Sequence, residues 1–352
     1  MFFYKLRNWS FSSLKTHISS HFSFFERPDW VSSDRFAENQ IYMNMKRRAF
    51  SADGIMHVYQ RTISGFNLFY TMEDFLIFYT IVSIQARRVG ICILGMCLMI
   101  DHVHMLVSSE CLSIMSRFIN SCTSLYVREF NACTGRQCPL FESPYGSAMK
   151  LDMKRIRSAI AYLFNNPVEK HLCSKAEQYK WNFLAHYGKY PSVRKADCSN
   201  RLRRSMSLAE ETFRRKRHLN HALLNTMMKD LTSEEKNKLA DHIISIYFPF
   251  DIKRTTDCYG SYEEMLIAIN SNTGSEYEII ETEYCRSDKP YRDIISFLHK
   301  KGIKDMHSVI CMDNENKLAM MQDIKAHTSA SYTQIRKFLH IQPLKRQTKP
   351  IR

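Results

Sequence analysis

The sequence lacks paired cysteines, and its eleven cysteines are scattered singly. No CxxC occurs, and the closest pairs are Cys92/Cys97 and Cys133/Cys138. A zinc ribbon or a disulfide framework would need tighter, paired spacing. Reduced cysteines, as found in the cytoplasm, are therefore the simplest interpretation.

Long apolar runs are also missing. The longest, 89–100, is too short to cross a bilayer, and it leads directly into Asp101 and His102. The first residues, MFFYKLRNWSF, hold no compact apolar region followed by a small-residue cleavage site, so no secretory signal is expected. We expect a cytoplasmic protein.

Acidic residues are scarce relative to basic ones. The 352 residues include 50 Lys and Arg against 35 Asp and Glu, a formal net charge of +15. This surplus favours a polyanionic partner, either nucleic acid or an anionic membrane surface. The hydrophobic share of 45% argues against wholesale disorder, and the length suggests two domains.

Strand-like and helix-like patterns alternate from about residue 54 to 187, within a predicted domain of residues 43–187. Strands are expected over 55–62, 91–99 and 103–108, with a hairpin or extended segment over 139–150. Helices are expected over 71–88 and 112–131, and a third from a cap at Asp152 to an end near Pro167. This order predicts an α+β fold: a ferredoxin-like antiparallel sheet with helices on one face, followed by a mostly helical C-terminal region.

The remaining segments differ in pattern. Residues 1–42 show no sustained period and are expected to be a disordered extension, or to precede a true start at Met43 or Met45. Basic residues crowd 188–217, which we interpret as a linker. Residues 218–352 are expected to form a helical accessory region. Within it, 317–341 is either a helix-turn-helix or an ordinary helical hairpin.

Two histidines stand two apart in a predicted strand. Because strand side chains alternate with period 2, His102 and His104 share one face while Val103 points into the core. Farther along, Tyr162 and Asn166 are four apart, so a helix places them on one side. Asn166 precedes Pro167, where its side chain can lean outward. Alone, each residue is better explained as a polar strand face, a core aromatic or a helix cap.

Together these residues suggest a chemical site. His102, His104 and Asn166 offer nitrogen and oxygen ligands for one divalent cation, Mg²⁺ or Mn²⁺. The cation would polarise a scissile phosphate, and Tyr162 would attack phosphorus to form a covalent phosphotyrosine. A covalent link conserves the phosphodiester energy, so a strand can be rejoined elsewhere.

The sequence resembles a known family over about residues 46–187. LMIDHVHMLV resembles the His-hydrophobe-His strand of HUH single-strand nucleases, and YLFNNPV resembles the tyrosine helix of REP-associated tyrosine transposases. Three further segments, 57–69, 135–147 and 176–183, match in the same order. The resemblance implies a ferredoxin-like fold, a divalent metal bound by His102 and His104, and cleavage and rejoining of single-stranded DNA at hairpin-forming palindromes. Tyr162 matches the nucleophile, and Asn166 matches the polar residue one turn later.

Some positions depart from the family pattern. Ile100-Asp101 stand where relatives often have Pro-Asn, Phe164 replaces a common His, and Asn182-Phe183 replace a Ser pair. These changes leave the expected metal set intact and bear on the substrate sequence.

Three hypotheses follow. The first is a metal-dependent transposase and endonuclease, a monomer or homodimer without a membrane partner, associated with the bacterial nucleoid when bound to DNA. The second is a non-catalytic DNA-binding regulator that keeps the fold, and the third is an RNA-directed protein. Residues expected to contact DNA are Lys46, Arg47, Arg48, Arg201, Arg203, Arg204, Gln334, Arg336 and Lys337.

Overall fold

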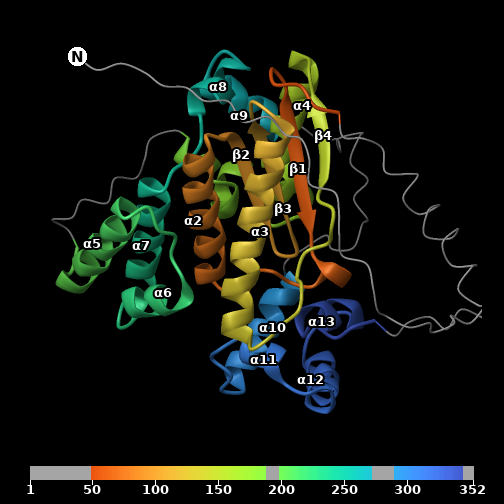
Figure 1. The fold of residues 1–352 in the computed structure, drawn as a ribbon. Helices are drawn as coiled ribbons and strands as arrows, with labels where there is room; N and C mark the ends of the chain where they lie inside the picture. The colour runs from red at the N-terminus through yellow and green to blue at the C-terminus, as the bar shows by residue number, and fades with distance from the viewer. Residues whose placement is uncertain (1–48, 188–197, 272–288, 344–352) are drawn as a thin grey trace, which may run out of the picture. The chain divides into compact units, whose positions relative to one another are not determined.

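A four-stranded antiparallel sheet lies at the centre of the described chain (Figure 1). The structure is a computed structural model that describes residues 49–187, 198–271 and 289–343. The strands, in the sheet order β2-β3-β1-β4, are β2 (Cys92–Met99), β3 (His102–Ser108), β1 (Ile55–Arg61) and β4 (Gly146–Lys150). This topology confirms the expected ferredoxin-like α+β fold.

One face of the sheet is covered by two long helices that pack against each other, α2 (Met72–Val89) and α3 (Leu112–Thr134) (Figure 1). α2 begins at a capping box in which Thr71 and Asp74 satisfy each other's backbone amides. Both helices end at glycines with positive φ, Gly90 and Gly135. The helices expected over 71–88 and 112–131 are thus confirmed.

The opposite face carries helix α4 (Met153–Glu169), which packs on β2 and β3. Helices therefore cover both faces of the sheet, and the expectation that they lie on one face was wrong. Asp152 caps it as expected, because its carboxylate accepts the Arg155 amide. A Cβ on Gly95 of β2 would lie 3.0 Å from the Phe164 ring, so the missing side chain permits this close approach. Phe164, at the position where relatives often have His, is therefore a buried packing residue.

After α4 the chain makes three short 3-10 turns, at Ala176–Gln178, Lys180–Asn182 and Leu184–His186. Buried Asn182 donates to the carbonyls of Phe164 and Ala176 and accepts the Leu184 amide. It thereby ties this segment to the last turns of α4.

The rest of the described chain is helical, as expected. The helices are α5 (Asn200–Arg214), α6 (His221–Met228), α7 (Ser233–Ile246), α8 (Ile252–Asp257), α9 (Tyr262–Asn270), α10 (Lys289–Lys300), α11 (Ser308–Cys311), α12 (Asn314–His327) and α13 (Tyr332–Phe338). α12 and α13 pack together as the two helices expected over 317–341. Among the described residues, no helix is both long and apolar enough to cross a membrane.

The described part of the stretch interpreted as a basic linker contains a folded element. α5 buries Leu202, Met206 and Ala209 and packs on α6 and α7. Its basic residues occupy the exposed side, so the charge run is one face of an amphipathic helix. Residues 188–197, the extension 1–42 and Lys46, Arg47 and Arg48 lie outside the described residues, and the domain boundaries remain predictions.

Candidate active site

Three histidines gather on the sheet face that α4 covers. β1 and β3 pair with Tyr59 opposite His104, so odd-numbered β1 residues share a face with His102 and His104. His57 thereby enters the site, and its Nε2 lies 3.1 Å from His104 Nδ1. Analysis of the sequence did not single out His57 as a site residue, although strand periodicity and a pairing register would have placed it there.

The two strand-β3 histidines each use Nδ1 for a neighbour. His102 Nδ1 lies 2.7 Å from Asp101 Oδ1, and His104 Nδ1 contacts His57. The rings of His102 and His104 are perpendicular, with centroids 4.9 Å apart. His102 Nε2 is buried and makes no hydrogen bond within the described part of the chain. Holding Nδ1 in this way leaves Nε2 as the donor for a metal.

Tyr162 of α4 lies against this cluster. Its ring centroid is 5.7 Å from that of His57 and 5.7 Å from that of His104. The side chain is only 2% exposed. The structure thus brings the expected nucleophile to the expected histidine pair, in a closed arrangement that a DNA strand cannot enter without movement.

Asn166 does not lean outward as expected. It is fully buried, because α4 continues through Pro167 to Glu169. Proline in the last turn forfeits one backbone hydrogen bond, and the Lys170 amide still bonds to the Asn166 carbonyl. The expectation of an exposed helix end was wrong, and a role for Asn166 as a metal ligand stays a prediction.

Asp101 links the histidine pair to the C-terminal helix α13. Its Oδ1 meets His102 Nδ1, and its Oδ2 lies 3.3 Å from Lys337 Nζ. Burial opposes ionisation of Asp101. The hydrogen bond and charge of His102, together with Lys337, outweigh burial and lower the pKa to about 2. Asp101 is therefore a carboxylate that orients His102.

The proposed DNA contacts on α13 face inward instead. Lys337 is 6% exposed and is paired with Asp101. Arg336 donates to the carbonyls of Ser64 and Ile341. The Gln334 side chain accepts the Ser331 amide, which caps the helix. This placement favours an ordinary helical hairpin over a recognition helix, because Lys337 and Arg336 contact the sheet domain. Contact of these three residues with DNA stays a prediction.

Basic residues form a groove of about 1590 Å³ beside α2, α3 and the end of α5. Seven basic and two acidic residues line it. The basic ones are Arg87, Arg88, Arg128, Arg214, Arg215, Lys216 and Arg217. Arg201, Arg203 and Arg204 lie exposed on α5 itself. Sequence analysis missed Arg87, Arg88 and Arg128, since only the packing of α2 and α3 brings them to this groove.

A known protein family matches the segment that carries these side chains. Residues 56–162 match the family model described as "Transposase IS200 like", and this segment is an IS200-like transposase domain. The matched range includes His57, His102, His104 and Tyr162.

One solved structure is also similar. It is described as a REP-associated tyrosine transposase bound to a REP hairpin. The two chains are 14% identical with a TM-score of 0.36, over 45% of this chain and 92% of that one. None of the curated proteins compared matches the chain.

Proposed function

We propose that this protein is a metal-dependent single-strand DNA transposase and endonuclease, with Tyr162 as its nucleophile. The observation that carries the proposal is the contact of the Tyr162 ring with His57 and His104 on one sheet face. A transposase family match over the same segment supports it.

The reaction follows from the residues present. The Tyr162 phenol loses its proton, its oxygen attacks phosphorus, and the bond from phosphorus to the 3′ oxygen breaks. The 3′ oxygen leaves as a hydroxyl, and the downstream strand stays joined to Tyr162 through its 5′ phosphate. Attack by a second 3′ hydroxyl reverses these steps and rejoins the strand.

His102 and His104 fit a divalent cation, Mg²⁺ or Mn²⁺, because the His102 Nε2 is buried without a hydrogen bond in the described chain. When bound, the cation supplies charge stabilisation for the phosphate. Asn166 is the proposed third ligand. Asp101 and His57 hold the two imidazoles through their Nδ1 atoms.

The proposed substrate is a hairpin-forming single strand, bound mainly through its phosphates by the basic surface. The proposed setting is the cytoplasm. Arg201, Arg203 and Arg204 remain proposed phosphate contacts, because they are exposed on α5.

The test is a covalent adduct. The protein is incubated with a pool of hairpin-bearing single strands labelled at the 3′ end, with and without Mn²⁺. We expect a labelled protein band with Mn²⁺ whose nucleotide maps to Tyr162. The Tyr162→Phe variant should bind DNA but form no adduct, since it removes only the attacking oxygen.

Matched controls are Tyr145→Phe and Tyr179→Phe, because those hydroxyls bond to Ser116 and to the Leu98 carbonyl. Both controls should keep the adduct. A wild-type protein that binds hairpins in Mn²⁺ but forms no adduct would instead be the non-catalytic DNA-binding regulator. The burial of Tyr162 would suit that alternative.

A further inference from the structure

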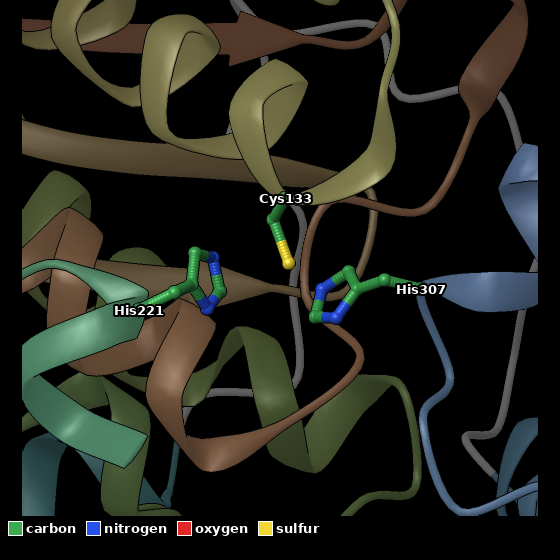
Figure 2. Close-up of side chains that lie close together, drawn as sticks. All are labelled: Cys133, His221 and His307. Atoms are coloured by element: carbon green, nitrogen blue, oxygen red, sulfur yellow. The ribbon is translucent and has the colours of Figure 1, made fainter. Parts of the chain in front are cut away.

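A second cluster of metal-binding side chains lies away from the proposed active site. Cys133 lies near the end of α3, His221 begins α6, and His307 precedes α11. One potential ligand atom from each lies within 4.8 Å of the others. Figure 2 shows the three side chains pointing toward one another from these separate elements.

A buried carboxylate adjoins the cluster. Asp74 is inaccessible to solvent, and its Oδ1 lies 3.0 Å from His307 Nε2 and 3.4 Å from His221 Nε2. Its other oxygen caps α2 by accepting the amides of Tyr70 and Thr71, and it also lies 3.1 Å from His307 Nε2. The cap fixes the carboxylate in place, so Oδ1 is presented to both imidazoles.

Hydrogen bonds among these buried side chains do not satisfy the Nε2 atom of His221. Nε2 of His221 is buried, and its contact with Asp74 Oδ1 at 3.4 Å does not have hydrogen-bond geometry. The His221 and His307 rings are packed edge to face with centroids 5.2 Å apart, so neither shields the other from the space between them. Leaving a buried ring nitrogen without a bond is unfavourable unless another ligand occupies that space.

We propose that Cys133, His221 and His307 bind a structural Zn²⁺, with Asp74 as the fourth donor. Thiolate and imidazole together select zinc over Mg²⁺ or Mn²⁺, which prefer oxygen. Bonds of about 2.0–2.3 Å set tetrahedral ligand atoms roughly 3.3–3.7 Å apart. The ligand atoms of Cys133, His221 and His307 lie within 4.8 Å of one another, so metal binding would require them to move closer together. Cys133 binds as the thiolate and releases its proton to water.

The site would join two parts of the chain. Asp74 and Cys133 belong to the helices over the sheet, whereas His221 and His307 belong to the helical region. The metal thereby fastens α6 and α11 to the ends of α2 and α3. This gives the helical region a fixed position on the transposase domain.

The experiment uses the full chain carrying His102→Ala, which removes a ligand of the proposed active site and leaves the cluster intact. Metal-free protein is loaded with Co²⁺ or Zn²⁺ and desalted. We expect about one metal per chain and a thiolate-to-cobalt charge-transfer band. Cys133→Ser should abolish that band, and Cys133→Ser or His221→Gln should weaken Zn²⁺ binding at least about tenfold.

Two controls separate removal of a ligand from general damage. Cys138→Ser removes an exposed thiol five residues after Cys133, and His327→Ala removes an exposed imidazole. Both should keep the band and the stoichiometry. Protein with an intact cluster that takes up no zinc, or that shows no thiolate band with Co²⁺, would overturn the proposal. So would a band that survives Cys133→Ser.

Discussion

At the scale of single residues, Asp101 is the contact that most affects the proposed metal ligand His102. It contacts both His102 and Lys337. A carboxylate that accepts the Nδ1 proton of a metal-binding histidine fixes the ring and raises its basicity. Asn can accept the same bond but carries no charge, so Asp101 is a stronger partner for His102 than an asparagine at this position would be.

Asp101→Asn should therefore raise the Mn²⁺ concentration needed for half-maximal adduct formation by about 10–100-fold. The neutral amide orients His102 less firmly and leaves Lys337 without its counter-charge. A Mn²⁺ titration of adduct yield measures the shift. Asp53→Asn, an exposed carboxyl outside the site, is the control. Identical titration midpoints in the wild type and Asp101→Asn would contradict the role of Asp101.

At the scale of elements, the approach of α4 to β2 positions Tyr162. Gly95 lies beneath Leu163 and Phe164, which directly follow the proposed nucleophile Tyr162 in sequence. A methyl group there would meet Phe164 Cζ at 3.0 Å and Leu163 Cδ2 at 3.3 Å. Interiors are too closely packed to absorb this without moving α4.

Gly95→Ala should destabilise the protein by about 1–3 kcal/mol and reduce the rate of adduct formation, because the displaced helix carries Tyr162. Urea unfolding and single-turnover cleavage measure the two effects. Adding Phe164→Leu to Gly95→Ala should recover part of the stability, which a double-mutant cycle detects as a coupling energy. Strictly additive effects would show that the two residues do not clash.

The position of α13 depends on a neutral histidine that follows it. His340 stacks on Phe66 with ring centroids 4.5 Å apart, and its Nε2 donates to the Asn67 carbonyl at 2.9 Å. Arg136 donates to Nδ1, which leaves no place for a second proton. Burial and the charge of Arg136 lower the pKa of His340 to about 3.

Stability should therefore fall on acidification between about pH 6.5 and pH 3. In that window His340 is protonated in the unfolded chain but not in the folded protein. The free energy of unfolding therefore falls by up to about 1.4 kcal/mol for each pH unit of acidification. His340→Phe should flatten this part of the pH dependence, as measured by urea unfolding at pH 5 and pH 7. Exposed His327→Ala should not. Equal slopes for wild type and His340→Phe would refute the assignment.

At the scale of the whole molecule, net charge and its distribution would govern the proposed encounter with DNA. The formal charge of +15 attracts any polyanion. The groove beside α2, α3 and α5 concentrates part of that charge, although Glu211 pairs with Arg214 and Arg215 there. The other groove cations should carry most of the phosphate contacts.

Replacing Arg128, Lys216 and Arg217 by Gln should weaken binding of all DNA sequences. It should also reduce the slope of log K against log salt by about 0.7–0.9 for each phosphate that the protein no longer neutralises. The matched control removes three exposed lysines elsewhere, Lys253, Lys289 and Lys300. Equal slopes in the two variants would mean that net charge, and not the groove, attracts the strand. A third variant tests Arg201, Arg203 and Arg204 in the same way.

Local sequence patterns were sufficient to predict most strands and helices of this protein and its fold class. Alternation along 102–108 and the four-residue spacing of Tyr162 and Asn166 predicted a histidine pair on a strand face and a tyrosine on a helix. The cap at Asp152 appears as expected, because capping is an interaction within one turn. The order of strands and helices then sufficed to predict the fold class.

Only the tertiary structure decided which distant residues meet. His57 joins the site through the register of β1 on β3, and Lys337 reaches Asp101 because α13 packs against the sheet domain. Cys133, His221 and His307 are too far apart in sequence for any spacing rule, which is why single cysteines suggested no metal. Periodicity and capping act over a few residues, whereas contacts between elements depend on how complete faces pack.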